Sequence, residues 1–200
     1  MLFPLRLFPS IPYYAAMSKC RQVSFDTTAR YNKADKDTHR FSIADTRGIL
    51  RLTVPVSRPS GAWSWKEVTV SDHGRWWETM PIALESAYGR TPYFEFYIDR
   101  LMPLFSPEPI AISEMCLRAD NAVRHMLDIR TPIIDAAADS EGSFIDSDFN
   151  TLFTLPPYWQ VRAHELGFIP GLSILDLIFN LGPEAQIYLD RLSTSHVQNC

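Results

Sequence analysis

The fold class follows from residues 2–26, LFPLRLFPSIPYYAAMSKCRQVSFD. Residues 2–8 are apolar and few in number, which indicates a short buried strand. Residues 11–19 are typical of a short helix, with Pro12 in its first turn. A second strand is predicted at residues 22–26. A strand, a helix and a strand in this order favour a parallel strand pair and therefore an α/β fold.

The other strand signals also lie in the first 71 residues. Residues 40–57 are predicted to form a β-hairpin that turns at residues 46–48, because apolar and polar residues alternate on both arms. Residues 67–71 alternate in the same way. Helical periodicity begins only later and predicts helices over residues 76–88, 92–105, 113–127 and 183–192. We therefore expect an α/β fold, in which a small mixed β-sheet with a hairpin fills the N-terminal part and helices of the C-terminal half cover it. An α+β fold is the alternative.

Length and composition indicate one globular domain over residues 1–200. The chain is 46% hydrophobic and 21% charged, so it can bury a sizeable core. Its net charge is −4, so the chain lacks the domain-wide basic character of a nucleic-acid binder. Residues 132–155, which include the acidic segment 135–148, show no periodicity and are predicted to be a loop.

Cysteine usage and hydropathy indicate the compartment. The three cysteines are odd in number and widely spaced, which gives neither a disulfide framework nor a metal-ligand pattern. A reducing, cytoplasmic location fits this usage. No segment approaches the roughly 20 apolar residues of a membrane span, so we expect no membrane insertion. We assign no metal and no cofactor.

A candidate site lies near the C-terminal end, where residues 156–160 (PPYWQ) are followed by residues 172–183 (LSILDLIFNLGP). The second stretch predicts a helix that is apolar on all sides except at Asp176 and Asn180. These two residues are four apart and share one face. A helix that is apolar all round belongs in a core, where a carboxylate and an amide need partners.

Each of these residues has an ordinary structural alternative. Ser173 is a good N-cap, and Asp176 three positions later can complete a capping box. Asn180 can satisfy free carbonyls near the end of the helix. In the functional interpretation Asp176 is a catalytic base, and Asn180 orients a substrate hydroxyl or amine. Tyr158 and Gln160 join Asn180 as predicted substrate-binding residues.

A second candidate site lies around the start of the hairpin. Lys33, His39 and Arg40 could clamp an anion, since Arg offers a planar fork for phosphate or carboxylate and Lys a point charge. His39 titrates near neutral pH and is a candidate catalytic base. The alternative is a solvated loop that carries surface charges.

Three further residues are placed by the expected topology. Asp26 ends the second strand, where a carboxylate often faces a cleft in a parallel sheet, and it is a candidate catalytic residue. Tyr13 and Tyr14 follow the first strand at the same edge. They could stack on a base or sugar ring and bind substrate, although core packing would explain them equally well.

The order and spacing of short motifs between about residue 10 and about residue 185 resemble the WbqC-like family. The motifs are Ser10–Tyr14, Tyr31–Lys33, His39-Arg40, Leu52–Val56, Trp76-Trp77, Glu85–Tyr88, Thr91–Phe94 and Leu172–Gly182. The resemblance implies a link to bacterial surface-polysaccharide (O-antigen) gene clusters. It also implies a transferase that modifies an activated sugar, for example by adding glycine, with a small-molecule substrate and glycan-assembly enzymes as partners.

The chain departs from the family pattern in its basic residues. Met80 stands where the family commonly has a basic residue, and the family's Arg-Asn-Arg/Lys element survives only as Thr38-His39-Arg40. Lys33, His39 and Arg40 would then carry anion binding. The residues alone leave open whether the chain is an enzyme. The alternative is a non-catalytic protein that binds a nucleotide sugar or serves as a scaffold for a glycosyltransferase.

Overall fold

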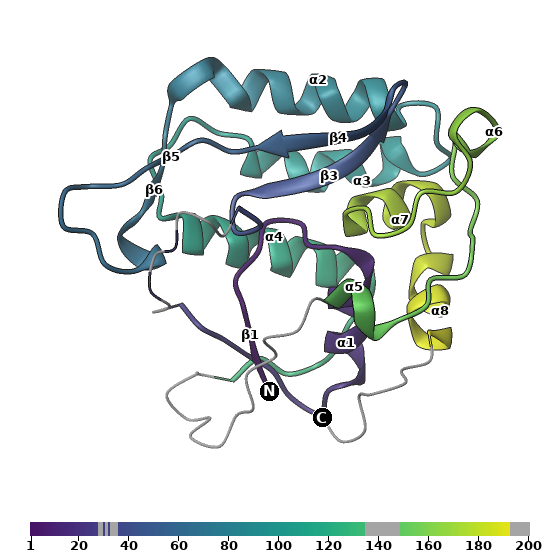
Figure 1. Ribbon diagram of the computed structural model, residues 1–200, viewed down its shortest axis with the longest axis horizontal. Coiled ribbons are helices and arrows are strands. Elements are labelled where there is room, and N and C mark those ends of the chain that lie inside the picture. The colour runs from purple at the N-terminus through teal and green to yellow at the C-terminus, as the bar shows by residue number, and fades with distance from the viewer. Residues whose placement is uncertain (28–29, 31, 33–35, 135–148, 193–200) are drawn as a thin grey trace.

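The computed structural model describes residues 1–200 except 28–29, 31, 33–35, 135–148 and 193–200 (Figure 1). The first 70 residues contain β1 (Leu2–Phe3), α1 (Ile11–Lys19), β2 (Ser24–Phe25), β3 (Arg40–Asp45), β4 (Gly48–Thr53), β5 (Val56–Ser57), the 3-10 turn η1 (Trp65–Glu67) and β6 (Thr69–Val70). After them come η2 (His73–Arg75), α2 (Trp76–Tyr88), α3 (Phe94–Leu101), η3 (Met102–Leu104), α4 (Ile112–Met126), α5 (Phe149–Leu152), α6 (Ala163–Leu166), α7 (Ile174–Leu181) and α8 (Glu184–Arg191).

The predicted mixed α/β fold is confirmed, but the described strands form three two-stranded sheets rather than one. β1 pairs in parallel with β2, as the strand–helix–strand order predicts. β3 and β4 form the antiparallel hairpin, and β5 pairs with β6. The second arm of the hairpin is therefore shorter than predicted, because the chain leaves β3 after Thr53 and pairs Val56 with Val70.

The first strand is also shorter than the predicted residues 2–8. Pro4 and Pro9 lack the backbone N–H that a sheet ladder uses. Phe8 has a φ of 44°, in the left-handed region that few non-glycine residues adopt. After Phe3 the chain therefore leaves the β1–β2 pair, and residues 4–10 run irregularly to the start of α1.

The two faces of the hairpin differ in character. Phe41 and Ile43 of β3 are buried, whereas Arg40 and Ser42 on the opposite face are half-buried. Ser42 lies opposite Arg51 of β4, which is exposed. Because side chains alternate along a strand, one face of the hairpin packs on the core and the other carries polar side chains.

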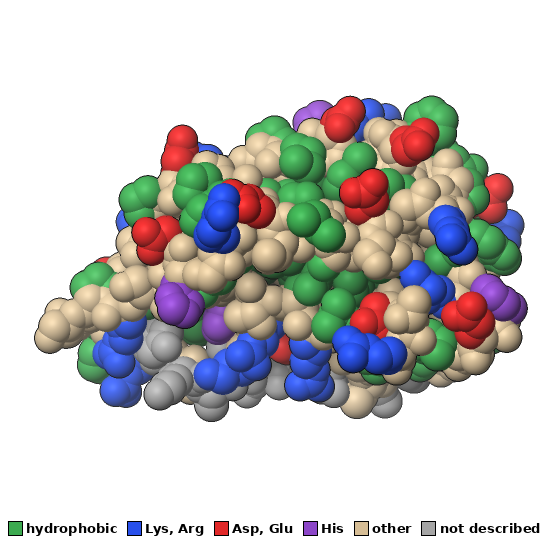
Figure 2. Space-filling view, turned by 90° about the horizontal axis from the view of Figure 1, so that it is seen from above, with side chains coloured by type: hydrophobic (Ala, Val, Ile, Leu, Met, Phe, Trp, Pro, Cys, Tyr) green, Lys and Arg blue, Asp and Glu red, His purple; other side chains and the backbone are tan. Residues whose placement is uncertain are grey.

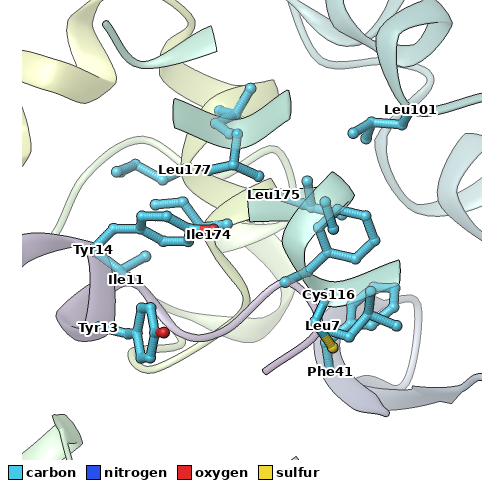
Figure 3. Packing of buried hydrophobic residues seen from close by; sticks show 14 of the residues in the cluster. Leu7, Ile11, Tyr13, Tyr14, Phe41, Leu101, Cys116, Ile174, Leu175 and Leu177 are labelled. Carbon is cyan, nitrogen blue, oxygen red and sulfur yellow. The ribbon is translucent and has the colours of Figure 1, made fainter. Parts of the chain in front are cut away.

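Helices enclose the core from several sides (Figure 1). α2 runs along the hairpin and contacts β3, and α7 contacts α1, α2, α3, α8 and β3. Every residue of α7 from Ile174 to Asn180 is buried, so the prediction of a helix inside the core is confirmed. Figure 3 shows side chains of α1, α7 and β3 meeting in this interior. α1 and α2 have the predicted bounds, because proline positions and apolar spacing are local signals.

Candidate functional site

A polar cavity of about 380 Å³ lies beside the hairpin. This volume falls in the range of roughly 300–1,000 Å³ that small-molecule sites occupy. Its walls come from the segment between β1 and α1, the hairpin with the residues just before it, Asn150 of α5, and the residues just before α7. Segments far apart in the chain therefore build one concave site.

The segments that precede α1 and α7 are joined at this cavity. Ser10 and Ser173, which both line it, form an isolated antiparallel bridge. Ile174 N donates to Pro9 O across 2.9 Å, and the Ser173 hydroxyl donates to Phe8 O across 2.8 Å. Ser173 is also the predicted N-cap of α7, since its hydroxyl accepts from Leu175 N. Two helices therefore begin at the cavity, and their N-terminal ends carry partial positive charge.

Basic side chains dominate the charges of the lining. Arg6, Lys36, Arg40 and Arg51 line the cavity together with one described carboxylate, Asp37. Nη1 of Arg6 lies 3.8 Å from Oδ2 of Asp37. Within the described parts of the chain, no ion pair joins Lys36, Arg40 or Arg51 to a carboxylate. Four cations against one anion leave an excess of three positive charges, which favours an anionic ligand.

The cations differ in their access to water. The Arg6 side chain is only 22% exposed, and the buried Nε atoms of Arg6 and Arg40 have no hydrogen-bond partner among the described residues. Such partly desolvated cations gain most from a bound counter-charge. Figure 2 shows that Lys and Arg side chains gather along the lower edge of the viewed face, while Asp and Glu are spread more widely.

The second predicted site is divided by the structure. Arg40 lines the cavity, whereas Lys33 lies outside the described residues. His39 is buried and does not line the cavity, and its Nδ1 lies 2.9 Å from Val54 O. Sequence reasoning missed Arg6, Lys36, Asp37 and Arg51 as members of the site. The polar position of Arg51 between Leu50 and Leu52, opposite Ser42, was a signal that could have found it.

Asp176, Tyr158, Gln160 and Asn180 are brought together in a separate buried network. The Tyr158 hydroxyl donates to Oδ2 of Asp176, and Gln160 Nε2 donates to the same oxygen across 2.9 Å. Gln160 also exchanges hydrogen bonds with the backbone of Ile169, at 3.0 Å and 2.9 Å. Burial raises the pKa of Asp176, and the hydrogen bonds from Tyr158 and Gln160 oppose that rise. The carboxylate therefore holds the segment before α7 rather than completing a capping box with Ser173.

Asn180 fastens the same segment at a second point. Its Oδ1 accepts from Val161 N across 2.9 Å, and its Nδ2 donates to Asp176 O across 2.7 Å. Its amide thus satisfies one helix carbonyl and one loop N–H. None of the four network residues lines the basic cavity. The arrangement can fix the position of the chain that leads into α7, and through it the floor of the cavity.

The remaining predicted residues lie elsewhere. Tyr13 and Tyr14 are buried in the core, as Figure 3 shows, and the Tyr13 hydroxyl donates to Pro4 O across 2.9 Å. Burial raises the pKa of both phenols well above the usual value. Asp26 is half-buried beyond the end of β2, and its backbone N–H donates to Phe3 O. None of these three residues lines the cavity.

The described residues contain neither a metal-binding cluster nor a membrane-spanning helix. In the described ranges, no three His, Cys, Asp or Glu side chains cluster in a way that could hold a metal ion. No described helix combines the length and the apolar character that crossing a bilayer requires.

Comparison with known proteins shows to which family the chain belongs. No curated protein and no solved structure matches the chain. The model of the WbqC-like protein family matches residues 6–143, which is more than half of the 200 residues. This range contains Arg6, Lys36, Arg40 and Arg51, and it ends before the α7 segment. The chain thus belongs to the WbqC-like protein family.

Proposed function

We propose that this protein is a cytoplasmic transferase that modifies an activated sugar in bacterial surface-polysaccharide synthesis, for example by adding a glycyl group. The basic cavity would hold the phosphate or carboxylate of the activated substrate. The observation that carries this proposal is that the described lining of a single cavity holds four cationic side chains and one carboxylate. Membership of the WbqC-like family supports it.

The cavity supplies the electrostatic part of such chemistry. Arg6, Arg40 and Arg51 present planar forks that match phosphate oxygens, and Lys36 adds a compact charge. Fixed positive charge stabilises the negative charge that develops on a departing phosphate. The nearby starts of α1 and α7 add to the same field.

A base must lie within hydrogen-bond reach of the proton that it takes. In transfer from an acyl phosphate, the sugar amine forms a bond to the acyl carbon and the bond from that carbon to the phosphate oxygen breaks. The amine then loses one proton. Asp26, His39 and Asp176 do not line the cavity, so in this proposal Asp37 accepts the proton.

A thermal-shift screen tests the proposal. Ligands that bind only the folded protein raise its melting temperature by mass action. The purified protein would be screened against nucleotide sugars, aminoacyl donors and acyl phosphates. We expect a shift that Arg40→Ala abolishes and Arg47→Ala retains. Arg47 is the matched control, since it lies in the same hairpin and its side chain is 86% exposed. If Arg40→Ala leaves every shift unchanged, the cavity is not the site.

A non-catalytic binding or scaffold role is the second candidate. Asp37 is the carboxylate of the described lining, and its Oδ2 lies 3.8 Å from Nη1 of Arg6. Because this carboxylate is paired with a cation, the cavity could bind an anion without supplying a catalytic base. This role predicts ligand binding without product formation. Incubation of a bound nucleotide sugar with amine and acyl donors, followed by mass spectrometry, separates the two roles. Co-purification with a glycosyltransferase would support the scaffold.

A further inference from the structure

The hairpin places two arginines next to each other on one face, and both line the cavity. Arg40 pairs with Thr53, and Ser42 pairs with Arg51. Arg40 and Arg51 are therefore diagonal neighbours on one face of the hairpin, with α-carbons about 7–8 Å apart. Both side chains line the cavity. Each guanidinium fork can bind the oxygens of one phosphoryl group, so two neighbouring arginines in one cavity suit two adjacent phosphoryl groups better than one.

Other cations of the lining come from outside the hairpin strands. Arg6 belongs to the segment between β1 and α1, and Lys36 precedes the hairpin. With Asp37 counted, the described lining keeps an excess of three positive charges. A single carboxylate would leave most of this charge uncompensated. A diphosphate ester, with two or three negative charges, matches it.

The same face also offers an apolar contact. Ile49 lies two residues before Arg51 in β4, lines the cavity, and is 60% exposed. Pro9 and Pro170 line the cavity as well. An apolar side chain next to two phosphate forks can cover the organic part of an ester, which inorganic diphosphate lacks.

We propose that the cavity binds a diphosphate ester, with Arg40 and Arg51 on the two phosphoryl groups and Ile49 against the organic part. A nucleoside diphosphate and a sugar diphosphate share this chemistry. The inference rests on the proposed anion binding in the cavity and names its substrate class.

Calorimetric titration of the full chain tests this assignment. The probes are inorganic phosphate, inorganic pyrophosphate, UMP, UDP and a hexose 1-diphosphate. We expect pyrophosphate to bind about tenfold or more tightly than phosphate, and UDP or the hexose diphosphate more tightly than pyrophosphate. Preference between the last two identifies the source of the diphosphate. Arg51→Ala should weaken pyrophosphate binding about tenfold. Arg47→Ala should leave it unchanged.

A second pair of variants tests the organic contact. Ile49→Ala should weaken the binding of the diphosphate esters and spare pyrophosphate. Ile82→Ala is the matched control, because Ile82 of α2 is 64% exposed and does not line the cavity. Arg51 and Ile49 are both exposed, so these variants should fold, and circular dichroism checks this.

The outcomes separate this inference from the proposed function. Equal binding of phosphate and pyrophosphate would overturn the diphosphate assignment. The diphosphate assignment would also be overturned if only acyl phosphates or carboxylates raised the melting temperature and Arg40→Ala removed that shift. That result would still support anion binding in the cavity. If none of these anions binds, both the diphosphate assignment and the proposed anion binding in the cavity are wrong. An unchanged UDP affinity in Ile49→Ala would overturn the ester contact.

Discussion

Gln160 Nε2 donates a hydrogen bond of 2.9 Å to Oδ2 of Asp176, a residue 16 positions further along the chain. Tyr158 donates to the same oxygen. One buried carboxylate of α7 thus holds two side chains of the irregular segment before it. Apart from Asp176 and Asn180, the buried residues of α7 are apolar, so the hydrogen bonds of these two side chains fix how the segment lies on the helix.

We expect Asp176→Ala to destabilise the protein by about 3–5 kcal/mol, since it leaves the Tyr158 hydroxyl and the Gln160 amide buried without their acceptor. Tyr158→Phe should cost only about 1–2 kcal/mol, because the carboxylate keeps the bond from Gln160. Urea unfolding measures both. Tyr97→Phe on α3, where no hydroxyl bond is formed among the described residues, is the control. Equal stability of Asp176→Ala and wild type would show that the network is not formed.

The amide of Asn180 has a direction that can be tested. Its Nδ2 donates to Asp176 O, and its Oδ1 accepts from Val161 N. Asn180→Asp replaces this donor with an oxygen that faces the carbonyl oxygen of Asp176, and it buries a charge. We therefore expect the free energy of unfolding to fall by about 2–4 kcal/mol at neutral pH. Asn121→Asp on the exposed side of α4 should change stability little. Similar unfolding midpoints for the two variants would contradict the assignment.

Asp120 of α4 should make stability fall as pH rises. Burial raises its pKa from 3.8 to about 6, whereas the charge of Arg124 and the nearby hydroxyl of Tyr14 lower it. The contact with Tyr14 falls outside hydrogen-bond geometry, so neither carboxylate oxygen has a hydrogen-bond partner among the described residues. Between about pH 4 and pH 6 the folded protein binds more protons at this group than the unfolded chain does. Its contribution to stability is therefore complete below pH 4 and is lost above pH 6.

We expect Asp120→Asn to be more stable than wild type by roughly 2–3 kcal/mol at pH 8 and nearly equal to it at pH 3.5. Urea unfolding of both proteins across this range gives the difference, in which the other titrating groups cancel. Asp99→Asn at an exposed position of α3 is the control. A difference that does not change with pH would refute the raised pKa.

Gly182, which follows α7, should not tolerate a side chain. It has a φ of 54°, and a β-carbon there would overlap the Tyr93 ring. Gly74 has a φ of 75° with open space around it. Gly74→Ala should therefore cost about 1 kcal/mol through backbone strain alone, and Gly182→Ala clearly more. Thermal unfolding compares them, and equal costs would mean that Tyr93 moves aside freely.

Local patterns determined several elements from the sequence alone. The bounds of α1 and α2, the hairpin turn and the buried position of α7 follow from proline positions and the spacing of apolar residues. The sequence predicts that a buried Asp176 needs partners and places Tyr158 and Gln160 in the same candidate site as substrate-binding residues, but only the structure shows that these two side chains are its partners. The division of the strands into three pairs was not predictable, since pairing joins residues far apart in the chain.

The basic cavity is a second example of residues whose meeting the sequence could not predict. The sequence pointed to Arg40 as an anion ligand, but only the tertiary structure brought Arg6, Lys36 and Arg51 beside it and placed His39 away from the lining. A charged side chain at a strand position looks the same in sequence whether it faces water or a cavity. What decides between them is which distant segments pack opposite it. Here the bridge between Ser10 and Ser173, residues of two segments far apart in the chain, closes the floor of the site.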